Sequence, residues 1–182
     1  MNFKNTCLLS LAFIFSGCGS CATSPNAGLT EYRSPGGEYV LRYLSPPWQV
    51  DSEDASGIVL EIPAPHVAEA SLDAALLPAK YNLSITFTSG TARDQVELDA
   101  EIAAIDMETI LVAPRAVLTD SGDAGWEMLS ERTNLNPRTF RRVSFDGPGG
   151  VVIHMVFEAS ASLDTVEVDR MIAAFDVLEA AS

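Results

Sequence analysis

Cysteine is absent from all but the first 21 residues of this 182-residue chain. The three cysteines are Cys7, Cys18 and Cys21, so the remainder forms neither a disulfide framework nor a cysteine-based zinc site. Histidine is nearly as scarce, with only His66 and His154, which argues against zinc sites of other kinds. A domain without cysteine suits an oxidising compartment, where a stray thiol would form the wrong disulfide.

Basic residues are also few. Lysine and arginine number 11 against 25 aspartates and glutamates, and the formal net charge is -14. Nucleic-acid binding requires clustered lysine and arginine, so we expect no nucleic-acid partner. Anionic lipid headgroups are repelled for the same reason, so membrane contact would have to come from an anchor. The simplest role of the charge is solubility.

Residues 1–17 have the pattern of a signal peptide. Lys4 supplies a short positive region, and residues 8–15 are apolar except for one serine. This run is far shorter than the roughly 20 residues of a membrane-spanning helix. Ser16 and Gly17, which end the segment, are small, as a signal peptidase requires.

Ser16, Gly17 and Cys18 resemble a bacterial lipobox, in which an aliphatic residue and two small residues precede a lipidated cysteine. Phe15 departs from the pattern, because leucine is usual there, and the residues before Cys21 match it less well. We therefore expect lipid attachment at Cys18, with a palmitate-type acyl anchor that holds the chain stably on a bilayer. The expected location is the bacterial cell envelope, at the outer membrane in preference to the inner. The alternative is an ordinary secretory signal with incidental cysteines.

The remainder divides into two parts. Residues 18–37 are rich in serine, proline and glycine, a composition typical of a flexible tether. Residues 38–182 have the length of one domain and can bury a core without disulfides or a metal.

Alternating apolar and polar residues predict most of the secondary structure as strands. The strongest alternation lies at 81–88, and 151–158 is apolar on both faces, which predicts a central strand covered on each side. The last four strands are separated by turn residues and predict an antiparallel meander. The predicted strands are 39–43, 58–62, 81–88, 115–119, 125–132, 139–146 and 151–158.

Two helices are predicted from apolar spacing. Leu98, Ile102 and Ile105 recur at i, i+4 and i+7, which predicts an amphipathic helix over 94–110 that packs by this face and stops before Pro114. The second helix is expected to begin at a cap and to end in a short strand at 175–178. Its cap and apolar positions are Asp164, Val168, Met171, Ile172 and Phe175. A further short helix is expected at 67–77.

The order of these elements and two local patterns resemble the PsbP-like family, the superfamily of the Ran-binding Mog protein and of DcrB-type bacterial lipoproteins. The first pattern, Ser-Pro-Pro-Trp-Gln-Val at 45–50, is similar to the family's Tyr-Pro-x-Trp-x-Val, with Pro47 where glycine is common. The second is Ala-Phe-Asp-Val at 174–177, after the apolar strand. The resemblance covers about 38–178 and implies an α+β domain, an α/β/α sandwich with a central antiparallel sheet. It implies protein binding or support of membrane assemblies, and places no binding residue.

The residues that could carry out catalysis have no recognisable catalytic partners in the sequence. His154, between valines on a strand, is expected to be a hydrogen-bonded sheet residue, with a general base as the alternative. His66 has no visible partner. The sequence has no nucleophile elbow, phosphate loop or dinucleotide fingerprint. We therefore expect no enzyme, no catalytic residue and no cofactor.

Charged clusters and tryptophans have structural interpretations too. The acidic runs at 51–54 and 120–123 are interpreted as solvated loops, with cation binding as a minor alternative, so no metal is expected. Arg138, Arg141 and Arg142 form the basic cluster, with Arg141 on the opposite face. We expect cross-strand pairing with Glu127 or Glu131, against an anionic docking patch. Trp48 and Trp126 are expected in the core.

The sequence thus predicts an exported, lipid-anchored domain that binds or scaffolds an unidentified envelope protein. Two alternatives stay open: a hydrolase-like envelope enzyme and a plain soluble periplasmic domain. A pocket that brings His154 or His66 to a serine and an acid would favour the enzyme.

Overall fold

The computed structural model describes residues 28–54, 57–62, 81–134, 137–160, 163 and 165–179. Several predictions lie outside these residues: the signal peptide at 1–17, lipid attachment at Cys18, His66, the helix expected at 67–77 and the cap expected at Asp164. Among the described residues, no helix is both long enough and apolar enough to cross a membrane.

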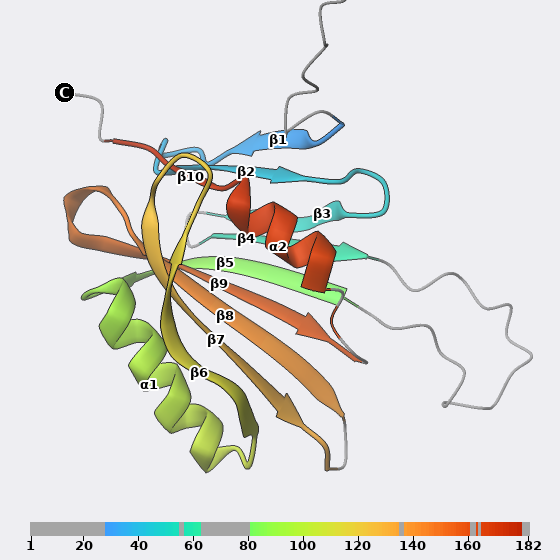
Figure 1. Ribbon diagram of the computed structural model, residues 1–182. Helices are drawn as coiled ribbons and strands as arrows, with labels where there is room; N and C mark the ends of the chain where they lie inside the picture. Colours follow the sequence, from blue (N-terminus) through green and yellow to red (C-terminus); the bar gives the residue numbers. More distant parts are fainter. Residues whose placement is uncertain are drawn as a thin grey trace, which may run out of the picture.

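Within the described residues, seven antiparallel strands form the larger sheet. Their bounds are β3 Gln49–Asp54, β4 Gly57–Ile62, β5 Tyr81–Ser89, β6 Thr109–Leu118, β7 Ala124–Arg132, β8 Arg138–Asp146 and β9 Val151–Ala159. Their order in space is β3-β4-β5-β9-β8-β7-β6 (Figure 1). The run from β6 to β9 is the predicted meander, and β9 lies centrally between β5 and β8, as its two apolar faces predicted.

A smaller sheet is formed by three further described strands. They are β1 Thr30–Arg33, β2 Tyr39–Tyr43 and β10 Asp176–Val177, with β2 in the middle. Because β1 lies within 18–37, the expected tether is wrong for this part, and the fold begins before residue 38. The serine, proline and glycine around this strand give the segment the composition of a linker. Tyr32 of β1 nevertheless packs on the core, with its ring centroid 6.2 Å from that of Tyr39.

Residues 51–54, expected as a loop, belong instead to the edge strand β3, which pairs with β4. All six residues of β3 are exposed. Charged side chains on an edge strand discourage pairing with another chain, which accounts for the acidic composition.

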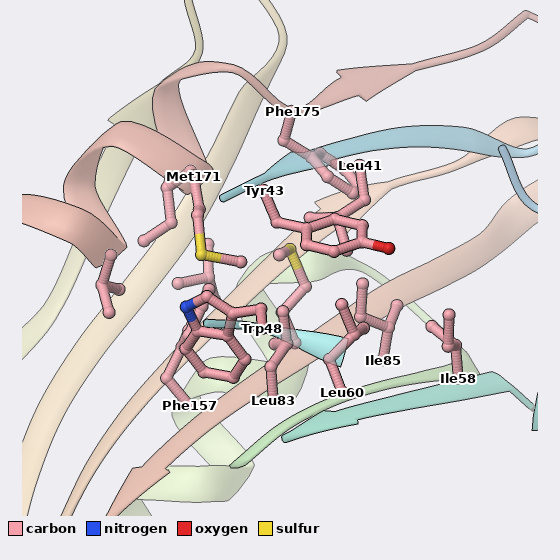
Figure 2. Packing of buried hydrophobic residues seen from close by; sticks show 14 of the residues in the cluster. Leu41, Tyr43, Trp48, Ile58, Leu60, Leu83, Ile85, Phe157, Met171 and Phe175 are labelled. Atoms are coloured by element: carbon pink, nitrogen blue, oxygen red, sulfur yellow. The ribbon is translucent and has the colours of Figure 1, made fainter. Parts of the chain in front are cut away.

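One face of the larger sheet carries the main core, together with the smaller sheet and helix α2, Thr165–Ala173. Val168, Met171 and Ile172 of α2 are buried in this core, as predicted. Trp48, which is 2% exposed, lies in the same core, near Met171 (Figure 2). The Trp48 indole Nε1–H donates to Glu167 Oε1 at 2.6 Å, so its polar edge is satisfied.

The opposite face is covered by helix α1, Ala92–Ile105, which lies across β6, β7, β8 and β9 (Figure 1). Helices on both faces make the predicted α/β/α sandwich with a central antiparallel sheet. The helix ends earlier than expected, and the chain enters β6, where Pro114 lies at a register shift of this edge strand.

The buried face of α1 differs from the predicted one. Leu98, Ile102 and Ile105 face solvent, and the helix packs by other residues: Ala92, Val96, Asp99 and Ala103. Only a small apolar cluster forms between α1 and the sheet. Its members are Val96, Ala103 and Met128, with Ala100 and Trp126 at its margin. Beside this cluster, the sheet face that carries His154 is mixed: Arg142 and Ser144 of β8 share it with the buried Val152 of β9. Small side chains and a carboxylate of α1 pack on this mixed face.

Candidate functional site

The outer side of α1 is the most distinctive surface of the described residues. Leu98, Ile102 and Ile105 are 49%, 42% and 78% exposed, and Met107, just past the helix, is 71% exposed. Residues at i, i+4 and i+7 share one side of a helix, so these side chains form a continuous row. We call these four residues the α1 stripe.

The stripe is part of an uneven distribution of exposed apolar side chains. Of the nine large hydrophobic residues exposed among the described residues, six lie between positions 98 and 111. The others, Val50, Leu118 and Val166, lie on three different elements. Scattered exposed hydrophobics are ordinary, whereas a contiguous group marks a surface for interaction.

Carboxylates border the stripe. Asp94, Glu97, Glu101 and Asp106 are all exposed, against one basic residue, Arg93, on the same segment. The Arg93 guanidinium pairs with Glu97, with 2.7 Å between Nε and Oε1. The surface of α1 therefore combines an apolar row with negative charge.

The C-terminus of α1 is built as a Schellman motif around Met107. The Glu108 N–H donates to Ala103 O at 2.8 Å, and the Met107 N–H donates to Ala104 O at 3.4 Å. Met107 has φ 59°, the left-handed conformation that glycine adopts without strain. An exposed methionine thus occupies a position where glycine would be more favourable for the fold.

Beneath α1, the sheet brings a serine, an imidazole and a carboxylate together. Ser144 and His154 are opposite each other on β8 and β9, with 3.0 Å between Ser144 Oγ and His154 Nδ1. His154 Nε2 lies 3.7 Å from Asp99 Oδ2, and the Gln95 amide donates to Asp99 Oδ1 at 3.1 Å. His154 is therefore a hydrogen-bonded sheet residue, as predicted.

These three groups have the composition of a hydrolytic triad without its access to substrate. Ser144 is fully buried, and His154 and Asp99 are 9% and 6% exposed. None of the described cavities is lined by any of the three. Burial lowers the pKa of His154 and raises the pKa of Asp99, because both charged forms lose their hydration there. The arrangement serves to seat α1 on the sheet.

Each arginine of the basic cluster forms an ion pair with an acidic side chain. Arg141 Nη2 lies 2.7 Å from Glu127 Oε2, and Arg141 also contacts Asp169 of α2. The predicted cross-strand pairing with Glu127 is therefore confirmed, on the face opposite Arg142. Arg138 pairs with Glu158 at 3.2 Å.

Arg142 lies on the α1 side of the sheet, where it pairs with Glu108 at 2.9 Å. Burial by itself would raise the pKa of Glu108, but hydrogen bonds from Arg142 and Ser130 outweigh it and lower the pKa. With acids beside all three clustered arginines, the cluster does not offer an anionic docking patch.

The remaining candidates are structural. Trp126 is partly buried at the margin of the α1 cluster, with the Arg93 guanidinium 5.1 Å from its ring centroid. Asp123 Oδ2 accepts hydrogen bonds from Ser121 Oγ and from the Val177 N–H, so the 120–123 turn fastens β10. In the part of the chain that the structure describes, no group of three His, Cys, Asp or Glu side chains could hold a metal ion.

Leu98, Ile102 and Ile105 of the stripe were identified in the sequence as a set, but assigned to the core, and Met107 was not identified. The helical spacing of apolar residues shows only that three side chains share a helix face. The helix sequence has no second apolar face of comparable size that would indicate burial of the opposite side. The signal that could have indicated the orientation of α1 is the group of polar residues on the strands beneath it. Arg142 and Ser144 of β8 share one face of the sheet with His154 of β9.

No protein-family profile matches this chain. No curated protein matches it in sequence. Among solved structures, it is similar to the solution structure of cyanobacterial PsbP (CyanoP) from Synechocystis sp. PCC 6803, with a TM-score of 0.52 and 17% sequence identity. The match covers 88% of this chain and 99% of that chain. At this identity the likeness concerns the fold, which is PsbP-like.

Proposed function

We propose that this chain is a lipid-anchored protein-binding module of the bacterial cell envelope, held by lipid on Cys18 and docking its partner on the α1 stripe. The observation that carries the docking proposal is the concentration of exposed apolar side chains at 98–111. An exposed apolar patch with a polar border is typical of protein interaction sites. Ser144 is fully buried and lines none of the cavities described above, which favours binding over hydrolysis.

The position of the stripe suits an anchored domain. Nine residues lie between Cys18 and Gly28, where the described chain begins, so the ten steps from Cys18 to Gly28 span at most about 35 Å when extended. The chain enters through β1, whose sheet packs on the face of the larger sheet opposite α1. A domain held from that side would present α1 away from the attachment point.

Site-specific photocrosslinking in living cells tests the docking proposal. A photoreactive amino acid at Ile102 should give a covalent adduct with another protein. The matched control is the same amino acid at Leu118, an apolar residue on β6 that is 65% exposed. Adducts absent at Ile102, or equally abundant at both positions, would remove the basis for a docking site on α1.

The anchor is tested by membrane fractionation and by mass spectrometry of the mature N-terminus. Wild type and Cys21→Ala should carry acyl mass on Cys18 and sediment with the outer membrane, whereas Cys18→Ala should lose both. A free amino terminus without acyl mass would contradict the anchor, as would unchanged sedimentation of Cys18→Ala. Cys21→Ala controls for loss of an incidental thiol in the same segment.

A further inference from the structure

Resting on the proposed function, we propose that the partner presents to α1 an amphipathic helix whose apolar face is flanked by lysine or arginine side chains. This names the chemistry of the occupant, which the proposed function leaves open. The shape of the stripe, the charge around it and the conformation of Met107 each support it.

The shape of the stripe favours a helix. Leu98, Ile102 and Ile105 form a ridge two turns long on a convex helix. Ridges with i, i+4 spacing fit the grooves between side-chain rows of another helix. The edges of the larger sheet are poorer sites for strand addition, because β3 is acidic and β6 is interrupted by register shifts.

The charge of the partner follows from the nearest carboxylates. Glu101 is three residues after Leu98 and four before Ile105, and Asp106 is four after Ile102, so both lie directly beside the stripe. Among the described residues, neither carboxylate has an ion-pair partner. Basic side chains on both margins of an incoming helix would meet them.

The same charges disfavour two other occupants. A second copy of the chain would bring Glu101 and Asp106 against their own equivalents, in a protein of net charge -14. A bilayer surface would oppose the same carboxylates with anionic headgroups. A basic protein helix is the occupant that gains from the apolar row and from its border.

Met107 adds an independent observation. A left-handed conformation costs a side-chain-bearing residue more than glycine, and such strained residues concentrate at functional sites. Met107→Gly should therefore keep or raise the thermal midpoint while removing a large apolar side chain from the end of the stripe. This variant separates binding from folding, because loss of binding cannot be attributed to an unfolded domain.

The test is a fluorescence anisotropy titration at about 0.15 M salt. The probe is a synthetic peptide of about five helical turns, with leucines along one face and lysines beside them. Its partner probe carries glutamate in place of every lysine. The lysine peptide should bind the wild-type chain at least about tenfold more tightly than the glutamate peptide.

Paired variants locate the binding. Ile102→Gln and Glu101→Lys should each weaken binding of the lysine peptide about tenfold, and Met107→Gly roughly fivefold. Leu118→Gln and Asp51→Lys make closely similar changes of polarity and charge at exposed positions on β6 and β3, and should alter the binding less than about twofold. Equal losses for Asp51→Lys and Glu101→Lys would overturn the proposal, because binding would then report only net charge.

Two further measurements decide between occupants. A dimer of the wild-type chain that Ile102→Gln dissociates, seen by analytical ultracentrifugation, would overturn the proposal in favour of a second copy. Binding to phosphatidylglycerol vesicles that Ile102→Gln abolishes would overturn it in favour of a bilayer. Stripe-dependent crosslinks in cells together with equal binding of both peptides would reject the basic helix and leave the docking proposal standing.

Discussion

The orientation of α1 predicts an unusual contrast between two substitutions on the same helix. Ile105 is 78% exposed, so only about a fifth of its apolar surface is buried. Full burial of an isoleucine stabilises by about 3 kcal/mol at most, which leaves about 0.6 kcal/mol at this position. Glutamine forms helix slightly better than isoleucine, so Ile105→Gln should change the free energy of unfolding by less than about 0.5 kcal/mol.

Val96, on the opposite side, is fully buried against Ala103 and Met128. Val96→Ala removes two methyl carbons, at about 0.8 kcal/mol each, and leaves a small cavity, for a loss of about 2 kcal/mol. For a chain of this length, the thermal midpoint should fall by roughly 4–8 °C. Ile105→Gln should leave it within about 2 °C of the wild type.

Urea unfolding and thermal melts, both followed by circular dichroism, measure the two changes. The sequence pattern taken alone would predict the reverse order, with Ile105 in the core and Val96 exposed. A loss of about 2 kcal/mol for Ile105→Gln would therefore refute the orientation of α1 and the docking surface with it. A loss below about 0.5 kcal/mol for Val96→Ala would do the same.

Three other substitutions test the polar contacts of the fold. Glu127→Ala removes the buried acidic partner of the largely buried Arg141, which then keeps only the exposed Asp169, and should cost about 3 kcal/mol in urea unfolding. Asp99→Asn should raise the free energy of unfolding at pH 8, because burial raises the pKa of this carboxyl and its charged form therefore opposes folding. The gain in free energy over the wild type should vanish as the pH falls towards about 4, because the carboxyl becomes protonated over this range. Trp48→Phe removes the hydrogen bond to Glu167 and should lower stability by about 2 kcal/mol, measured by the same unfolding curves.

The strands could be predicted because a sheet imposes a period of two on every strand it buries. Alternation at 81–88 and the two apolar faces at 151–158 placed β5 and β9 correctly, including the central place of β9. The pairing of Arg141 with Glu127 followed from the same period, since neighbouring strands bring diagonal side chains on one face within reach.

The candidate site could not be predicted in the same way. A helical period identifies an apolar row, but which way the row faces depends on the surface that the helix meets. That surface includes Ser144, Arg142 and His154 from two strands, and only the register of these strands shows that the three polar side chains lie together. β1 was missed for a related reason, because Tyr32 is a single apolar residue in a segment whose composition is that of a linker.

The layer under α1 departs from the usual amphipathic arrangement, in which large apolar residues attach a helix and polar residues face water. Here the attachment combines a small apolar cluster around Val96 with several polar contacts. Thr91 caps the first turn, Asp146 accepts the Ala92 N–H at 2.7 Å, and Asp99 faces His154 at the middle of the helix. Specific contacts of this kind fix the position of α1 without the large apolar residues of its sequence.

Those residues are therefore not explained by the stability of the domain. A row of exposed leucine and isoleucine side chains contributes little to the stability of a monomer and raises the tendency of the protein to aggregate. Such a row is typical of a surface that a partner covers. The same reasoning accounts for the buried serine, imidazole and carboxylate. Groups that a hydrolase would need at an open cleft are used here to hold a helix, and the solvent side of that helix is left to apolar side chains and carboxylates. The docking proposed for α1 accounts for its exposed apolar row, and the buried serine, imidazole and carboxylate lie among the contacts that hold the helix.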